Sequence, residues 1–335
     1  MKIRPVRLIA AGAVVSLLVL GSGPASTPTR NAIADPTPIH LSDATAAPTA
    51  TPVPGTVTVS SIAALLTALA DNSVDEIVVA DGTYHVSSAS MDHADSLSMD
   101  HADSLWIGAA YAKRTQPVTV RAATQGGVTF DGGGAASFGC LSFEAGAHDQ
   151  TWDGFRCANG RANETGVITF GGYPGLAAPN HITMNNITIM SSCTGSATSA
   201  SAPATDHAFY VSEAVGGPHD LVFNDVTVDG RGGLASAFQF YHSDAANQNG
   251  WNITVRRLHV IGTQEAIILW DPTLRAITFD TVDVSGALRY AVRYEQGTGI
   301  TLTDITSTGS GSGQGFYSSQ GATPAGVTFS GDSFH

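Results

Sequence analysis

Positive charge is scarce in this sequence. Lysine and arginine together number 15 against 28 aspartates and glutamates, the formal net charge is −13, and the lysines are Lys2 and Lys113 alone. Such a chain supplies neither electrostatic steering toward phosphates nor release of counterions, which excludes nucleic acid and anionic membrane surfaces as partners. An acidic polymer could bind only through a local cluster of arginines or a bridging cation.

Cysteine is also scarce, since the sequence contains Cys140, Cys157 and Cys193 and no others. Three cysteines are too few for a disulfide scaffold, and their spacing fits no zinc site. In an exported protein we expect one disulfide and one remaining thiol. No motif requires a cofactor, and the identity of any metal stays open. Ca²⁺ could bind carboxylate oxygens, although no spaced calcium loop is present.

Long apolar runs are missing except at the N-terminus. There the basic residues Lys2, Arg4 and Arg7 precede an apolar run over 8–20. Small residues follow it, so residues 1–25 are typical of a secretory signal peptide of bacterial type, with a signal anchor as the alternative. The run is too short for a good membrane span. We therefore expect a secreted or cell-surface protein with no membrane span in the mature chain.

The composition changes after the signal. Residues 26–56 are rich in threonine, alanine and proline, as in "TATPVPGT". This composition cannot bury a core and favours extended, solvated chain, so it predicts a linker. The folded domain is expected over 57–335.

Helical pattern is confined to one segment. "SIAALLTALAD", from Ser61 to Asp71, is amphipathic, and Ser60 or Ser61 can cap its N-terminus. Its place before the first repeat suits a helix that covers the open end of a stack of strands.

A repeated phrase dominates the rest of the chain. Each copy alternates apolar residues, passes through a two-residue polar corner, and becomes apolar again. The copies are "ITMNNITI" from Ile182, "LVFNDVTV" from Leu221, "ITVRRLHV" from Ile253, "ITFDTVDV" from Ile277, "ITLTDITS" from Ile300 and "VTFSGDSF" from Val327. Asn and Asp suit such corners because they tolerate left-handed backbone.

A second apolar strand leads into each phrase. These strands are "VITF" (167–170), "AFYV" (208–211), "AFQFY" (237–241), "AIILW" (266–270), "AVRYE" (291–295) and "GFYSS" (315–319). Three short strands per repeat with glycine-rich connections predict an all-β right-handed parallel β-helix, a single-stranded solenoid of about 7–9 coils with an N-terminal capping helix.

The beginning of the expected domain resembles a known superfamily. "SSIAALLTALADNSVDEIVVADGTYHV" and "LWIGAAYAKRTQPVTVRAATQGGVTFDG" share the capping helix, the "ADGTY" corner, "QPVTVRA" and "GGVTFDG" with pectin lyase-like β-helix proteins. They are most similar to the branch of alginate lyases and chondroitinase B. The resemblance implies extracellular action on acidic polysaccharide, usually by β-elimination, less often by hydrolysis or epimerisation. The catalytic lysine and arginine of that branch have no counterpart, because no lysine follows Lys113, so no catalytic residue is carried over.

Candidate site residues follow from the alternation of the lead-in strands, since β-helix enzymes use the outward face of one sheet. Alternation turns these side chains outward or places them at the following corners: Gln239, Tyr241, His242, Trp270, Asp271, Arg293, Glu295 and Tyr317. Stacking predicts one column of Tyr241, Trp270 and Glu295, with His242 beside Asp271 at the corner.

These residue types suit sugar chemistry. We predict that Arg293 neutralises a uronate carboxylate and that His242 or Tyr241 removes the acidified proton. Trp270, Gln239 and Tyr317 would bind the sugar. Alternatively, Asp271 and Glu295 could be the acid and base of a glycoside hydrolase. A third alternative is a non-catalytic surface protein that binds glycan, and a purely structural Arg293–Glu295 ion pair stays open.

Two other features are assigned to structure, and a third remains a competing functional surface. The phrase "SMDHADSL" occurs twice in tandem over 90–105. This repeat predicts a duplicated loop near the capped end, with a weak metal site as the alternative. "GPHD" (217–220) occupies the place of "APNH" (178–181) one repeat earlier, so we interpret both as turns. The outer face with Arg257 and His259 competes as a functional surface.

Overall fold

The computed structural model describes the folded part of the chain in segments. These are residues 55–86, 103–108, 114–132, 138–144, 146–160, 166–171, 177–190, 207–212, 214–231, 233–241, 250–309, 311, 315–321 and 324–334. The predicted signal peptide, nearly all of the linker, most of the duplicated phrase and His242 lie outside them. Among the described residues, no helix has the length and apolar character needed to cross a membrane.

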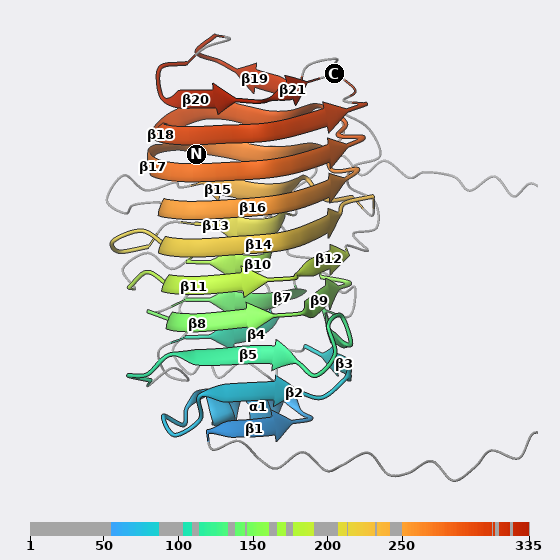
Figure 1. Cartoon of the computed structure of the whole chain (residues 1–335), viewed down its shortest axis with the longest axis vertical. Helices are drawn as coiled ribbons and strands as arrows, with labels where there is room; N and C mark the ends of the chain where they lie inside the picture. The colour runs from blue at the N-terminus through green and yellow to red at the C-terminus, as the bar shows by residue number, and fades with distance from the viewer. Residues whose placement is uncertain are drawn as a thin grey trace, which may run out of the picture. The chain divides into compact units, whose positions relative to one another are not determined.

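All strands pair in parallel and form three ladders (Figure 1). The front ladder stacks β1 (Thr56–Val59), β2 (Glu76–Val79), β5 (Val118–Ala122), β8 (His148–Asp153), β11 (Asn180–Asn185), β14 (His219–Asp229), β16 (Trp251–Ile261), β17 (Glu265–Ser285), β18 (Tyr290–Thr308) and β20 (Val327–Ser330). β14, β16, β17 and β18 are long because each continues around the corner into the next ladder.

The side ladder consists of β3 (Gly82–His85), β6 (Val128–Asp131), β9 (Phe155–Ala158), β12 (Thr188–Met190), the ends of β14, β16, β17 and β18, and β21 (Ser333–Phe334). The back ladder consists of β4 (Asp103–Ile107), β7 (Phe138–Phe143), β10 (Gly166–Phe170), β13 (His207–Val211), β15 (Ser236–Tyr241), the starts of β17 and β18, and β19 (Phe316–Ser318).

The solenoid is right-handed. In Figure 1 the front strands run from left to right while the chain rises from β1 to β20, and the back strands return in the opposite direction. The predicted parallel β-helix is confirmed, and every predicted lead-in strand falls on the back ladder. The front ladder contains more strands than the predicted number of coils, because β1 already belongs to the stack. Its first residue, Thr56, was assigned to the linker.

The polar corners adopt left-handed backbone, even at Arg257 and Thr281, whose residue types rarely do so. Asn186, Asp225, Arg257, Thr281 and Asp304 have φ between 51° and 60°, and they occupy equivalent places on successive coils. Left-handed backbone at this point turns the chain from the front ladder into the side ladder without a loop. The prediction of a corner at each phrase is therefore confirmed.

The core is a continuous column of apolar side chains inside the coils. Phe209 and Phe238 stack with their ring centroids 4.5 Å apart, and Phe223 meets Phe238 edge to face at 5.1 Å. Such paired rings add to the free energy gained by burial and hold adjacent coils in register.

Helix α1 (Ile62–Leu69) covers the first coils. The Ser61 hydroxyl accepts a hydrogen bond from the backbone N–H of Ala64 at 3.1 Å and caps the helix, while Leu65 and Leu69 are buried. The buried guanidinium of Arg114 donates to carbonyl groups at and beyond the C-terminal end of α1, including that of Asp71 at 2.8 Å. These bonds satisfy carbonyl groups that have no partner within the helix.

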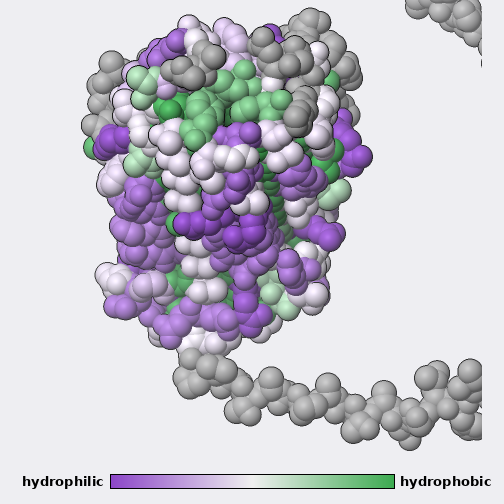
Figure 2. All heavy atoms as spheres, turned by 45° about the horizontal axis from the view of Figure 1, so that its top comes forward, coloured by the Kyte–Doolittle hydropathy of each residue, from purple (hydrophilic) through white to green (hydrophobic). Residues whose placement is uncertain are grey.

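The last coil is less enclosed. Phe316, Val327, Phe329 and Phe334 pack against the core but are only partly buried. Figure 2 turns this end toward the viewer and shows hydrophobic surface gathered there, above sides that are mainly hydrophilic. Asp332, which replaces an apolar residue of the repeat, accepts a hydrogen bond from the N–H of Ile305 at 2.8 Å.

The expected disulfide is not formed. The two described cysteines, Cys140 and Cys157, are both free and buried, and Cys193 lies outside the described residues. Burial raises the pKa of the Cys157 thiol, and its hydrogen bond with Cys140 raises it further. Both cysteines are fully buried and pack as apolar core side chains.

Candidate functional site

The site is built on the outward face of the back ladder, where β15, β17, β18 and β19 lie side by side. Gln239, Ile268, Arg293 and Tyr317 occupy equivalent positions on these four strands. The alternation of the sequence explains this face, because the neighbouring side chains Phe238 and Phe240 point into the core and are fully buried. Ile268 faces the same way as Arg293 yet is also buried.

Arg293 is the centre of the site. Its Nε donates a hydrogen bond to Oε1 of Glu295 at 2.8 Å, and its Nη1 lies 3.7 Å from Oε2 of Glu265. The guanidinium carbon lies 5.0 Å from the ring centroid of Trp270, which is a cation–π contact. Burial by itself would lower the pKa of Arg293, but the hydrogen bond to Glu295 and the charges of both glutamates raise it above its ordinary value.

Glu265 is a site residue that the sequence analysis did not identify. Its side chain is only 3% exposed, and its Oε1 accepts a hydrogen bond from Nη1 of Arg289 at 3.2 Å. Burial raises the pKa of Glu265, while Arg293 and Arg289 act in the opposite direction. Strict alternation turns Glu265 inward with Ile267, which is why the pattern missed it. A charged residue directly before the apolar strand "AIILW" was the available signal.

Trp270 is the most exposed part of the site, with 43% of the residue accessible. Tyr241 meets its ring edge to face, with the centroids 5.8 Å apart, as stacking on adjacent coils predicts. The prediction that Glu295 is the third member of this column is wrong. A register shift after Leu269 pairs Trp270 with Gln296, which leaves Glu295 between coil positions and turns it toward Arg293.

Asp271 does not belong to the accessible site. It is completely buried at the corner after Trp270, where its Oδ1 accepts a hydrogen bond from the hydroxyl of Thr273 at 2.6 Å. A carboxylate in this place stabilises the turn and cannot reach a substrate, so the predicted pair of Asp271 and Glu295 is wrong. The predicted neighbour His242 lies outside the described residues.

Further polar side chains extend the face on both sides. Tyr317 stacks on Tyr290 with the ring centroids 4.7 Å apart. Toward the N-terminal coils, Nδ1 of the buried His207 lies 2.8 Å from the hydroxyl of Ser236, and Ser236 pairs in register with Glu265. Burial lowers the pKa of His207 to about 3, so this histidine is neutral at physiological pH.

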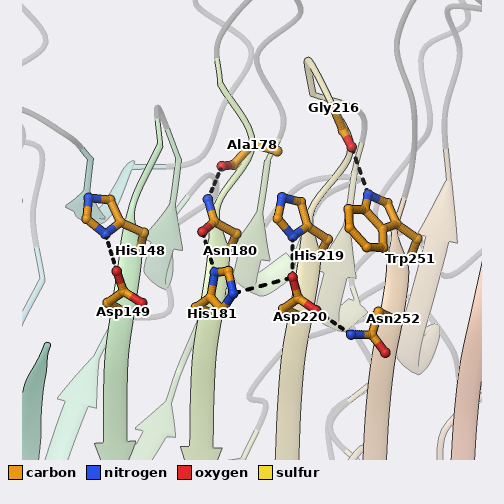
Figure 3. A network of polar contacts seen from close by, with 10 residues as sticks. All are labelled: His148, Asp149, Ala178, Asn180, His181, Gly216, His219, Asp220, Trp251 and Asn252. Carbon is orange, nitrogen blue, oxygen red and sulfur yellow. Dashed lines mark hydrogen bonds and ion pairs between the residues drawn. The ribbon is translucent and has the colours of Figure 1, made fainter.

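A second polar network follows the start of the front ladder, on β8, β11, β14 and β16 (Figure 3). His219 binds Oδ2 of Asp220 at 2.7 Å through Nδ1, and its ring stacks on Trp251 at 4.3 Å. Asp220 and His181 have equivalent places one coil apart, and both have left-handed backbone. The second halves of "GPHD" and "APNH" thus open strands β14 and β11 instead of forming separate turns, and Nε2 of His181 lies 3.6 Å from Oδ2 of Asp220 across the stack.

The competing outer face carries exposed ion pairs. Arg257 binds Asp225 at 2.6 Å, and Nδ1 of His259 lies 2.9 Å from Asp283. Exposed pairs of this kind contribute little free energy. Within the described segments, no group of three or more His, Cys, Asp or Glu side chains is arranged to hold a metal ion.

Among known proteins, the chain is similar to several solved structures. No family model and no curated protein matches the chain. A 1,3-α-1,4-β-D-galactose-4-sulfate-3,6-anhydro-D-galactose-2-sulfate 4-galactohydrolase is 13% identical over 73% of this chain and 52% of its own, with a TM-score of 0.45. A pectate lyase variant from Xanthomonas campestris is 14% identical over 82% and 79%, with a TM-score of 0.37.

An alginate lyase of family PL6 is 11% identical over 78% of this chain and 40% of its own, with a TM-score of 0.35. This chain therefore spans about half the length of the galactohydrolase and less of the alginate lyase. Identities this low assign no reaction and no residue role to the chain.

Proposed function

We propose that the protein is a secreted polysaccharide lyase that cleaves a uronate-containing glycan on the outward face of the back ladder. The observation that carries the proposal is the environment of Arg293. Two glutamates fix the guanidinium against the exposed ring of Trp270, next to Tyr241. An aromatic face beside a fixed cation suits a sugar ring that bears a carboxylate.

The contacts of Arg293 leave part of its hydrogen-bonding capacity for a ligand. Glu295 and Glu265 engage Nε and Nη1, and Nη2 makes no hydrogen bond within the described segments. In the proposed complex, Nη2 binds the uronate carboxylate while the pyranose ring rests on Trp270. Gln239 and Tyr317 lie in the same column as Arg293 and would bind neighbouring hydroxyl groups.

The chemistry follows from neutralising that carboxylate. Neutralisation acidifies the proton on C5 of the uronate, and a base removes it. The electron pair then forms the C4–C5 double bond, the C4–O bond breaks, and the leaving oxygen takes up a proton. Tyr241 is the candidate base among the described residues, and His242 follows it in the sequence.

The test is a panel of alginate, polygalacturonate and unsulfated glycosaminoglycans, followed by the ultraviolet absorbance of the unsaturated product. The proposal predicts a rise in absorbance on at least one polymer, abolished in Arg293→Ala and retained in Arg121→Ala. No rise on any uronate polymer would exclude the lyase.

A glycoside hydrolase is the second candidate, favoured by the carboxyl groups of Glu265 and Glu295 on either side of Arg293. Glycosidases use two carboxyl groups as acid and base, and Glu295, with a side chain that is 13% exposed, is the more accessible of the two. New reducing ends without a rise in absorbance, lost in Glu295→Gln, would select this reaction. Retention of glycan without turnover would instead support a binding protein.

A further inference from the structure

A groove of about 670 Å³ adjoins the arginine site at the corner between the back and front ladders. Its lining consists of Pro272, Tyr294, Glu295, Gln296, Gly297, Thr298, Gly299, Ser319, Gln320, Ala325 and Gly326. The volume lies within the range of small-ligand sites. The groove therefore has room for sugar rings next to Trp270 and Arg293.

The walls of the groove are held in place by their own hydrogen bonds. The Tyr294 hydroxyl donates to the carbonyl oxygen of Gly297 at 2.7 Å, and Nε2 of Gln320 donates to the carbonyl oxygen of Glu295 at 2.7 Å. Gly326 is required at the closest approach, because a Cβ there would collide with the Gly297 carbonyl and the Tyr294 hydroxyl. The groove is thus formed before any ligand arrives.

Glu295 joins the groove to the arginine site. Its carboxylate binds Arg293, and the same residue lines the groove. The next residue, Gln296, pairs in register with Trp270 and is exposed. A chain of sugars that rests on Trp270 can therefore continue into the groove past Gln296.

The charges of the two neighbouring sites differ. The arginine site contains Arg293 and Arg289, whereas the groove is lined by no cation and by one anion, Glu295. Its other polar groups are neutral amides and hydroxyls. The charge of Glu295 is already balanced by Arg293, so an anionic sugar in the groove would find no cation left to pair with, while an uncharged sugar can form hydrogen bonds with the neutral groups.

We propose that this groove is a subsite for an uncharged sugar, so that the preferred polymer alternates uronate with neutral sugar instead of repeating uronate. This inference rests on the proposed uronate site at Arg293. It names the sugar that must follow the uronate along the chain.

The first experiment measures the affinity of the full-length protein for hyaluronan fragments, in which glucuronate alternates with uncharged N-acetylglucosamine, and for alginate and polygalacturonate fragments of equal length. The proposal predicts at least about tenfold tighter binding of hyaluronan, the factor that corresponds to about 1.4 kcal/mol. Ser319→Arg places a cation in the groove and should reduce this preference by about tenfold. Ser330→Arg, on the exposed edge of β20 outside the groove lining, is the matched control and should leave it unchanged.

The second experiment separates the groove from the arginine site. Ala325→Trp fills the groove, and Ala63→Trp makes the same change on the exposed surface of α1. Neutral oligosaccharides of glucose, galactose and mannose should lose binding in Ala325→Trp and keep it in Ala63→Trp and Arg293→Ala. Loss of neutral-sugar binding in Ala325→Trp alone would support the groove as a sugar subsite. If Arg293→Ala nevertheless leaves uronate binding intact, the proposed function is refuted while the groove proposal is retained.

Two results would overturn the groove proposal while leaving the proposed function intact. One is that Ala325→Trp changes the binding of no sugar. The other is that homopolyuronates bind as tightly as hyaluronan and Ser319→Arg alters neither affinity.

Discussion

Replacing Arg293 by alanine separates a catalytic cation from a structural ion pair. The substitution removes the 2.8 Å hydrogen bond to Glu295, the 3.7 Å contact with Glu265 and the cation–π contact with Trp270. The side chains of Arg293 and Glu295 are 24% and 13% exposed, so solvent screens their interaction only in part.

The expected loss of stability follows from these contacts. A hydrogen bond between charged groups contributes about 1.5–3 kcal/mol, and a partly exposed cation–π contact adds about 0.5–1 kcal/mol. We therefore expect Arg293→Ala to lower the free energy of unfolding by about 2–3 kcal/mol. Glu265 keeps Arg289 as a partner, which prevents a larger loss.

The matched control is Arg121→Ala. Arg121 binds Glu76 through the same atom, Nε, at 2.7 Å, but on the front ladder and with side chains that are 39% and 32% exposed. Screening limits such a pair to about 0–1 kcal/mol. Denaturant unfolding followed by tryptophan fluorescence measures both variants.

Turnover distinguishes the two roles of Arg293. Removing a group that stabilises developing negative charge costs about 10²–10³ in rate, so Arg293→Ala should lose at least that factor while Arg121→Ala keeps the wild-type rate. If Arg293→Ala is destabilised as expected yet turns over glycan as fast as Arg121→Ala, Arg293 is only a structural partner of the two glutamates.

Three further predictions concern stability. Because the pKa of His207 falls from 6.5 in the unfolded chain to about 3 in the fold, its contribution is fully present above pH 6.5 and is lost as the pH falls toward 3. This loss of unfolding free energy is about 3 kcal/mol by pH 4. His207→Asn removes the titrating group, so its unfolding free energy should decline less steeply between pH 6.5 and pH 4 than that of the control His148→Asn. The raised pKa of Glu265 has the opposite sign, since its contribution is fully present below its ordinary pKa of 4.5 and is lost at higher pH. Glu265→Gln should therefore gain stability relative to wild type as the pH rises above 4.5, while turnover falls. An unchanged difference across that range would contradict this assignment. Phe238→Ala should cost about 3–5 kcal/mol in denaturant unfolding, because it empties a fully buried place between Phe209 and Phe223; a cost below about 1 kcal/mol would show that the coils repack.

The sequence by itself determined the solenoid because its signals are local. Alternating apolar residues require only that neighbouring side chains point to opposite faces, and a polar corner such as Asn185-Asn186 requires only a left-handed residue. The same logic predicted a cap at Ser60 or Ser61, of which Ser61 forms it, and it turned Arg293 outward on its strand. Each of these depends on a few consecutive residues.

Tertiary structure decided which of these outward residues meet. The register shift between β17 and β18 moves Glu295 out of the column of Trp270 and onto Arg293, and no pattern in either strand announces that shift. The corner after Trp270 buries Asp271, while the start of β17 brings Glu265 to the two arginines. These placements depend on how coils of unequal length stack. For that reason the sequence specified the face of the candidate site, and the stacking of the coils specified its chemistry.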